Sequence, residues 1–564
     1  MNRKLLIFIL LALSGVGTAL RAQTIVQGAP ENGVIINYYV YDDGHAEVSG
    51  FRDDNNPKTG IVNVQDAVEY NGTTYPVTGI GSGGFQANGY NEVTSISLPA
   101  TVQSIQQNAF SGCTKLHTVT FRGNSQLSSI GYRAFYNCDS LKSITIPASV
   151  DTLHVRAFED CDNLDTVYFN AVHCEFTGEH YTAGSWYYTP FKHVSLSSIV
   201  IGNTVQKLPN HFLMNTNTCP TLQFASNSTL EDLGSYAFSS TGYTSITLPA
   251  SVKTIGFRAF EGCEQLASVT FDGTPIVETI GNGAFKGCSS LHSFSIPSSV
   301  KTIERYAFEN CGLYSVTLPV SLEYIAPEIF IGCTSLQTVA FADGIELEYL
   351  SENCFAGCSA LTFIEIPSSV KMIEPYAFSG CENLTTVTFE ENTQLESIER
   401  MAFQFCNKLR NIHVPAGVNI GEFAFLEVEN IYVGAAHAAD LNCPWGARFC
   451  NATFDGDFVY ADQAQTQLIG YLNTKATAVT VPSTVVSIGD EVFAGMRNLT
   501  SVAFPTGITS LGNAIFYGCP NLGEVVVNNT LLHAAPLPEG ITTYTIPNSI
   551  TSISAGAFYD RTIT

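Results

Sequence analysis

The sequence predicts a β-rich solenoid, with one parallel sheet along one face and short turns, irregular segments or short helical segments along the other. A unit of 22 to 26 residues recurs down the 564-residue chain, and self-similarity at such a period indicates a repeat architecture. Within each unit apolar and hydroxyl side chains alternate, as in a half-buried strand. Hydrophobic residues make up 45% of the chain and charged residues 13%, and this composition favours strands and turns.

Each unit is interpreted as one coil of the solenoid. In the segment LHTVTF, Leu116, Val119 and Phe121 would point inward, while Thr118 and Thr120 would point outward. One coil cannot bury its apolar side chains alone, so stacked coils must share a continuous core. The phenylalanine of the unit falls at residues 85, 110, 135, 158, 238, 260, 285, 308, 330, 355, 378, 403 and 425, with looser copies at 212, 493, 516 and 558.

The pattern AF-x-(G/N)-C-x-x-L-x-x-(V/I)-x-(F/I)-P, found over most of residues 75–564, resembles the BspA-type leucine-rich repeats of bacterial surface and secreted proteins. The resemblance implies a leucine-rich-repeat solenoid that serves as an extracellular or cell-surface binding scaffold. It further implies adhesion to a host or partner-cell protein, with host matrix proteins among the candidates. It implies neither an enzyme nor a particular ligand. The pattern lacks the asparagine that follows the strand in the commonest leucine-rich repeats, so no asparagine ladder is expected.

Interruptions in the repeat predict how the chain is divided. Hairpin-like strands around DDG and NG turns precede the first good repeat, where an N-terminal cap is expected. Two later stretches lengthen the phenylalanine spacing and are interpreted as insertions. The predicted parts are a signal peptide (1–22), an N-terminal cap region (23–77), repeats (78–169), degenerate repeats with an insertion (170–230), repeats (231–425), an insertion or degenerate repeat (426–478) and C-terminal repeats (479–564).

The N-terminus predicts export. Arg3 and Lys4 precede the apolar run 5–13, and small residues follow, in the order typical of a secretory signal peptide. The run is too short to span a bilayer, and no later stretch has about 18 consecutive apolar residues. We therefore expect an exported protein, extracellular or at the cell surface, with no transmembrane segment.

Charge and motifs narrow the function classes. The formal net charge is -25, which would repel phosphate backbones, so nucleic acid is not an expected partner. No Walker loop, nucleophile elbow or H-E-x-x-H zinc signature occurs, so neither an enzyme nor a cofactor is expected. No metal site is expected either: four residues of one insertion match no standard spacing, and the DDG and DGD segments are commoner as turns. The insertion residues are His173, Cys174, His180 and His193, and the two acidic segments contain Asp42, Asp43, Asp455 and Asp457.

Most of the sixteen cysteines share one repeat position, where stacked coils would give parallel Cβ vectors and poor disulfide geometry. We therefore expect a column of buried free thiols that pack as small hydrophobes. Cys443 and Cys450 lie outside the column, in a loop-like segment, and could form a disulfide.

The outward strand positions predict where a ligand would bind. Serine and threonine fill most of them, and the structural reading of these two hydroxyl columns is that they suit a crowded parallel sheet. A ligand recognised on this face would use the residues that interrupt the columns. The interruptions proposed for binding are Tyr168, Phe363, Glu365, Asn411 and His413; Glu524 also departs from the columns.

An aromatic insertion provides the second candidate site. Tyr181, Trp186, Tyr187 and Tyr188 are clustered, and such aromatics stack on sugar rings or anchor a protein partner. Core packing that closes the interrupted coil is the structural alternative. Protein binding is the first functional hypothesis, and glycan binding by the insertion near 181–191 is the alternative.

Overall fold

A computed structural model gives the structure of the protein, and it is built from strands and turns in a solenoid of about 16 turns. It describes residues 24–28, 34–51, 60–86, 92–178, 189–428 (without 192, 217, 218, 410, 413 and 416), 430–433, 448–532 (without 452, 472, 474, 490, 491, 494, 495, 497, 513, 514, 517, 518, 520, 523 and 528–530) and 552–553. No helix occurs among these residues. Turns therefore form the part of each coil where the sequence predicted turns, irregular segments or short helical segments. The chain folds as two compact units, Met1–Val205 with Pro220–Ala225, and Gln206–Cys219 with Ser226–Thr564.

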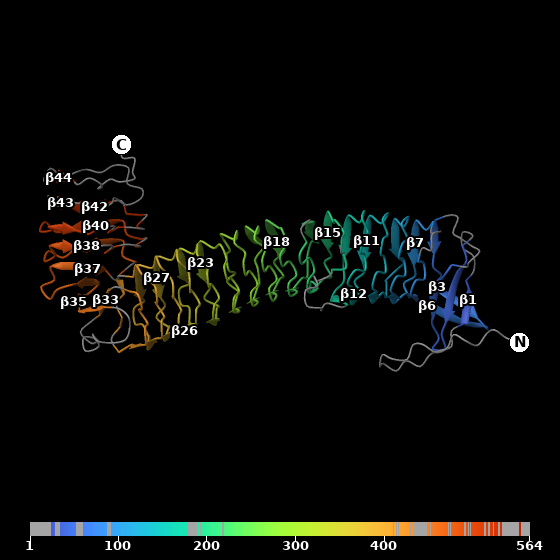
Figure 1. The fold of residues 1–564 in the computed structure, drawn as a ribbon, viewed down its shortest axis with the longest axis horizontal. Helices are drawn as coiled ribbons and strands as arrows, with labels where there is room; N and C mark the ends of the chain where they lie inside the picture. The colour runs from blue at the N-terminus through green and yellow to red at the C-terminus, as the bar shows by residue number, and fades with distance from the viewer. Residues whose placement is uncertain are drawn as a thin grey trace. The chain divides into compact units, whose positions relative to one another are not determined.

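In the first unit the coils form two rows of parallel strands, one of longer and one of shorter strands (Figure 1). The long strands are β4 (Ile61–Asn63), β7 (Ser95–Leu98), β9 (Thr118–Phe121), β11 (Ser143–Ile146), β13 (Thr166–Phe169), β15 (Ser198–Ile201) and β16 (Thr221–Phe224). The short strands are β8 (Ser104–Ile105), β10 (Ser129–Ile130), β12 (Thr152–His154) and β14 (Glu175–Thr177).

An antiparallel meander precedes the first coils. It comprises β1 (Thr24–Gln27), β2 (Ile36–Val40) and β3 (Ala46–Phe51), and an antiparallel hairpin of β5 (Ala67–Tyr70) and β6 (Thr73–Ile80) follows it. β3 pairs parallel with β6, and β6 pairs with β8, so the meander continues directly into the row of short strands.

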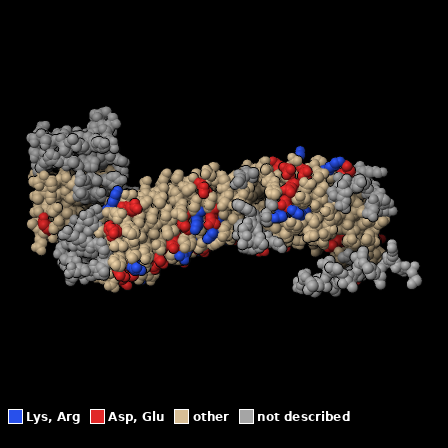
Figure 2. Space-filling model, in the orientation of Figure 1, with Lys and Arg blue, Asp and Glu red and all other residues tan. Residues whose placement is uncertain are grey.

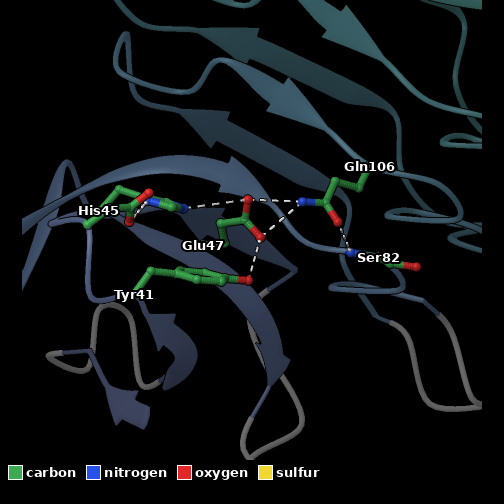
Figure 3. A network of polar contacts seen from close by, with 6 residues as sticks. Tyr41, His45, Glu47, Ser82 and Gln106 are labelled. Carbon is green, nitrogen blue, oxygen red and sulfur yellow. Dashed lines mark hydrogen bonds and ion pairs between the residues drawn. The ribbon is translucent and has the colours of Figure 1, made fainter. Parts of the chain in front are cut away.

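A polar network ties the meander to the first coils (Figure 3). Gln106 Nε2 donates to both carboxylate oxygens of Glu47, at 2.9 and 3.0 Å, and Tyr41 Oη donates to the same carboxylate at 3.0 Å. The ring of His45 stacks on Tyr41 at 4.4 Å. Burial, followed by the charge of Glu47 and this hydrogen bond, raises the pKa of Tyr41, so the phenol stays protonated as a donor.

The second unit repeats the two-row arrangement. Its long strands are β18 (Ser245–Pro249), β20 (Ser268–Asp272), β23 (Ser315–Leu318), β25 (Thr338–Phe341), β27 (Phe363–Ile366), β29 (Thr386–Phe389) and β31 (Asn411–Ile412). Its short strands are β17 (Asp232–Leu233), β19 (Thr254–Ile255), β21 (Thr279–Ile280), β22 (Thr302–Ile303), β24 (Tyr324–Ile325), β26 (Tyr349–Leu350), β28 (Met372–Ile373), β30 (Ser397–Ile398) and β32 (Asn419–Ile420).

A second antiparallel meander lies within this unit and again leads into short parallel strands, as β37 pairs with β39. Tyr460 is fully buried in its β36, as Tyr38 is in β2 of the first meander. The meander consists of β35 (Thr453–Asp455), β36 (Phe458–Tyr460) and β37 (Gln467–Tyr471). The parallel strands around it are β33 (Asn430–Val433), β34 (Arg448–Asn451), β38 (Ala478–Thr480), β39 (Ser487–Ile488), β40 (Ser501–Phe504), β41 (Ser510–Leu511), β42 (Glu524–Val527), β43 (Leu531–Leu532) and β44 (Ser552–Ile553).

Two columns of side chains fill the interior of the coils. The repeat phenylalanines stack with ring centroids 4.9 to 5.5 Å apart and interplanar angles of 2 to 15°. The repeat cysteines are buried free thiols, as their shared position predicts. Each thiol donates to the carbonyl of the phenylalanine one coil earlier, at 2.9 to 3.4 Å. The cysteine therefore satisfies a buried backbone acceptor as well as packing as a hydrophobe.

Candidate functional site

The outward hydroxyl columns of the long strands have structural partners. Thr247 and Thr270 lie opposite each other on β18 and β20, and their hydroxyl oxygens are 3.0 Å apart. The hydroxyl of Thr120 donates to the carbonyl of Ile96 on the neighbouring strand at 3.3 Å. Such contacts along and between strands account for serine and threonine at these positions without a ligand.

Tyr168 interrupts the columns of the first unit at an accessible place. It lies on β13 in register with Thr145 and Val200, and its side chain is exposed. The side chain of Tyr168 is therefore accessible to a ligand, as the sequence-based hypothesis requires.

Phe363 and Glu365 on β27 lie in a different environment. Lys475, which follows β37, has its Nζ 3.5 Å from Glu365 and 3.8 Å from Glu390. Burial raises the pKa of Glu365, an effect that the charge of Lys475 opposes. The outward threonines of the next strand, Thr386 and Thr388, are buried although their register points them away from the core. Contact within the chain thus covers part of this predicted site.

Several predicted site residues lie outside the described part of the chain. They are Tyr181, Trp186, Tyr187, Tyr188, His413 and Cys443, together with the side chains of Asn411, Glu524 and Cys450. Their binding roles and the disulfide remain predictions, as does the signal peptide at 1–22.

One candidate cation cluster was missed because its members are distant in sequence. Glu159, Asp160 and His193 place three potential ligand atoms within 4.8 Å of one another. Glu159 already pairs with Arg133 at 2.7 Å, and His193 Nδ1 lies 2.8 Å from Asp160. The guanidinium would compete with a metal ion for the Glu159 carboxylate, so the cluster is explained by its own ion pairs.

Most described coils have two residues with left-handed backbone conformation, and the two positions differ in side chain. The first left-handed column lies two residues before the repeat phenylalanine and the second lies two residues after it. In one coil Leu213, and not the neighbouring Phe212, occupies the phenylalanine position. Both have similar φ values, such as +52° at Arg258 and +70° at Gly262. Both also donate a backbone hydrogen bond to the next coil, at 2.9 and 2.8 Å for these two residues. The backbone therefore makes the same demand at both positions.

Residue choice nevertheless separates the two columns. The second column is mainly glycine, asparagine, aspartate and serine, which tolerate this conformation. It consists of Gly112, Asn137, Asp160, His193, Asn215, Ser240, Gly262, Gly287, Asn310, Gly332, Gly357, Gly380, Phe405 and Glu427. The first column instead bears large, partly exposed side chains in most described coils: Arg133, Arg156, His211, Tyr236, Arg258, Tyr306, Glu328, Tyr376, Met401 and Phe423.

Cations and aromatic rings of the first column and its neighbours hold each other in place. The Arg258 guanidinium lies 5.1 Å from the ring centroid of Phe257 and 5.9 Å from that of Tyr236. The ring centroid of Tyr306 lies 4.8 Å from the Arg305 guanidinium and 5.3 Å from the Lys286 ammonium. Such contacts reduce the conformational freedom of the long side chains, so this edge is an ordered, amphipathic surface.

Comparison with known proteins identifies the repeat. The model of the BspA-type leucine-rich repeat region matches residues 78–181, 187–312, 274–348, 301–432 and 470–564. The chain belongs to this family. No curated protein gives a significant match.

Solved structures similar to this BspA-type chain include a leucine-rich cell surface protein from Faecalibacterium prausnitzii, at 25% identity and a TM-score of 0.33, covering 71% of this chain and 95% of that one. A leucine-rich repeat protein from Bacteroides ovatus has 22% sequence identity and a TM-score of 0.23, and the match covers 87% of this chain and 92% of that one. The pneumococcal vaccine antigen PcpA has 17% sequence identity and a TM-score of 0.29, and the match covers 76% of this chain and 99% of that one.

The BspA-type solenoid is typically a non-catalytic binding scaffold, and the sequence prediction of the family and fold is confirmed. Within the described residues, no helix has the length and apolar character needed to cross a membrane. The first left-handed column was overlooked in the sequence, although a signal was present. Arginine and tyrosine recur immediately before Ala-Phe, while glycine and asparagine recur immediately before the cysteine.

Proposed function

We propose that the protein is an extracellular or cell-surface scaffold that binds a protein of a host or partner cell. The observation that carries this proposal is the contrast between the two left-handed columns. Large side chains in left-handed conformation cost roughly 1 kcal/mol each, and the second column largely avoids them. We take the retention of arginine and tyrosine in the first column to favour recognition, in addition to the cation–π contacts and ion pairs that these side chains make within the chain.

Protein recognition is the benefit that suits these side chains best. Arginine and tyrosine are enriched at the energetic centres of protein interfaces. Arg305 and Lys286 both lie over the ring of Tyr306, so a sugar that stacked there would compete with them. Guanidinium groups have further donors, and tyrosine combines an apolar ring with a polar hydroxyl. Such a surface matches the mixed polar and apolar surface of a protein.

Glycine substitution tests the proposal because it removes the side chain and suits the backbone. We would replace Tyr236, Arg258 and Tyr306 together by glycine and measure binding to immobilised fibronectin, laminin, collagen and fibrinogen. The expected result is a loss of at least about tenfold in affinity with an unchanged or higher unfolding midpoint. The control replaces Gly262 and Gly287 by alanine in the same region, which strains the backbone without altering the first column.

Two results would count against protein binding. One is a wild-type protein that binds none of the four matrix proteins. The other is a glycine variant that binds as the wild type does, while remaining folded. A loss of binding in the alanine control equal to that in the glycine variant would point to stability instead of recognition.

Glycan binding through the insertion near 181–191 remains the alternative prediction from the sequence. Its aromatic residues lie outside the described part of the chain, and no contact of a described residue favours it over protein binding. A glycan array probed with Trp186→Ala beside the wild type would test it directly.

A further inference from the structure

A column of charged residues runs along the short strands of the second unit, immediately before each short strand from β17 to β30. In order along the coils it consists of Glu231, Lys253, Glu278, Lys301, Glu323, Glu348, Lys371 and Glu396. Acidic and basic side chains are seen next to one another along this edge in Figure 2. Neighbours of opposite charge pair across coils: the nitrogen–oxygen distance is 2.9 Å for Lys253 with Glu231, 3.5 Å for Lys301 with Glu278 and 2.6 Å for Lys371 with Glu348.

The alternation of charge fails once, where Glu348 follows Glu323. Both side chains are exposed, and Glu323 forms no ion pair with any described residue. Elsewhere the backbone continues from coil to coil, with Glu323 N donating to Lys301 O at 3.1 Å and Lys371 N to Glu348 O at 2.8 Å. No backbone hydrogen bond joins these two described glutamates, and one sheet of short strands ends at β24 while the next begins at β26. Adjacent like charges are unfavourable in a sheet, so the split coincides with an unfavourable pair.

Two exposed tyrosines lie beside this pair of glutamates. Tyr324 and Tyr349 begin β24 and β26, and their side chains are 48% and 43% exposed. The preceding coils have threonine at this position, as at Thr279 and Thr302. Within the described part of the chain, neither tyrosine ring stacks on another ring or on a cation, unlike Tyr306. The exposed parts of both side chains are therefore accessible to a partner.

The surrounding sequence shows which charge a partner would supply. Between Arg305 and Lys371 there is no lysine, arginine or histidine, yet the segment has eight acidic residues. The intramolecular contact of Lys371 with Glu348 shows that a lysine ammonium fits against this column. A cation is what the alternation lacks, and exposed tyrosine rings attract cations.

We infer that the surface formed by Glu323, Tyr324, Glu348 and Tyr349 binds a lysine or arginine side chain of the partner protein. This inference rests on the proposed function, since it names the chemistry of one contact in that binding. The cation would lie between the two glutamates and against the tyrosine rings, restoring the alternation across the split in the sheet. An exposed segment with a basic side chain flanked by small residues would have access to this surface.

The test uses the full chain and a fluorescein-labelled twelve-residue peptide of alternating lysine and serine, followed by fluorescence anisotropy. Glu348→Lys supplies the missing cation from within the protein, and Tyr324→Ser with Tyr349→Ser removes the exposed rings. Each change should weaken peptide binding by about tenfold or more. Glu348→Lys should change the unfolding midpoint little, because it removes the pair of adjacent glutamates but replaces the exposed ion pair of Glu348 with Lys371 by two adjacent lysines.

Two controls separate this surface from general charge. Asp343→Lys makes the same charge change in the same cation-free segment, at an exposed turn after β25, and Tyr314→Ser removes an exposed tyrosine beside the long strands. Both should change affinity by less than about threefold. The inference is overturned if Asp343→Lys weakens binding as much as Glu348→Lys, or if Glu348→Lys binds like the wild type. The inference of a protein partner would also be overturned if spermidine displaced the labelled peptide as effectively as an unlabelled peptide does.

The matrix-protein panel distinguishes failure of this inference from failure of the proposed function. If the wild type binds a panel protein and Glu348→Lys binds it equally well, this surface is not the contact and protein binding stands. If the wild type binds no panel protein, the proposed function itself fails. Expected instead is a parallel loss of affinity for the peptide and for the bound panel protein in Glu348→Lys.

Discussion

The interior and the exposed edge of the same coils follow different rules. Inside the second unit, stacked rings recur with nearly constant spacing, and each repeat thiol donates to a phenylalanine carbonyl. Along the edge, the first left-handed column changes from Arg258 to Gly283 to Tyr306 within three coils, although the backbone conformation stays the same. Packing thus determines which residue occupies each interior position. Backbone conformation alone does not explain which side chains occupy the edge.

This difference distinguishes architecture from recognition without knowledge of a ligand. A side chain that recurs in every coil with the same contacts is explained by those contacts. A side chain that is present against the local backbone preference, or that interrupts an alternation as Glu348 does, requires a different explanation. We place the candidate binding surface on the edge for that reason, and substitutions in the interior and at the edge should have opposite consequences.

The largest expected effect arises from the interior thiols at alkaline pH. Burial raises the pKa of Cys263 and of Cys333 to about 12, from about 9 for an unperturbed thiol. Because the folded pKa is the higher one, the stabilisation is fully present below pH 9 and is lost as the pH rises toward 12. Each such thiol should lower the free energy of unfolding by roughly 1.4 kcal/mol per pH unit in this window.

Urea unfolding between pH 8 and 11 measures this loss. The matched variant replaces Cys263 and Cys333 by serine, whose hydroxyl does not titrate in this range. The free energy of unfolding of this variant should fall less steeply with pH, and the difference in slope should correspond to about two protons per molecule. Equal slopes for both proteins would show that these thiols do not control alkaline stability.

The next effect contrasts two phenylalanines with different environments. Phe308 is fully buried between Phe285 and Phe330, while Phe257 is 40% exposed at the edge. Phe308→Ala should lower the free energy of unfolding by about 3–5 kcal/mol, because it leaves a cavity in the column. Phe257→Ala should cost less than about 1 kcal/mol. Chemical denaturation of both variants checks the contrast, and similar losses would refute the distinction between interior and edge.

The interior could be predicted from the sequence because its signal is periodic. Alternation around Val119 indicated the strand, and the shared position of the cysteines indicated free thiols. The hydrogen bond from each thiol to a phenylalanine carbonyl was not predictable, since it requires the spatial offset between neighbouring coils. Likewise, the contact of Lys475 with Glu365 joins residues more than a hundred positions apart, so no local pattern reveals that part of the outward face is covered.

A smaller effect distinguishes two buried cysteines of the second unit. Cys333 Sγ lies 3.0 Å from the Phe308 carbonyl oxygen, whereas Cys354 Sγ is 4.0 Å from the Ala377 carbonyl oxygen, at a position where most coils have alanine. Cys333→Ala should lower the free energy of unfolding by about 1–3 kcal/mol, because a buried acceptor loses its donor. Cys354→Ala should lie within about 0.5 kcal/mol of the wild type, because alanine suits this position. Equal losses in guanidinium unfolding would mean that the thiol acts by volume and not as a donor.

The smallest effect concerns the two left-handed columns themselves. Tyr376 and Gly357 have φ of +61° and +74°, so the same backbone conformation holds a large side chain at one and none at the other. Tyr376→Gly should raise the free energy of unfolding by up to about 1 kcal/mol, less whatever packing the ring provides, and Gly357→Ala should lower it by about 1 kcal/mol. Urea unfolding of the two variants and of the double variant gives both values and their additivity. A stability loss in Tyr376→Gly as large as that in Gly357→Ala would mean that the tyrosine is retained for packing, and the edge would then need no partner to explain it.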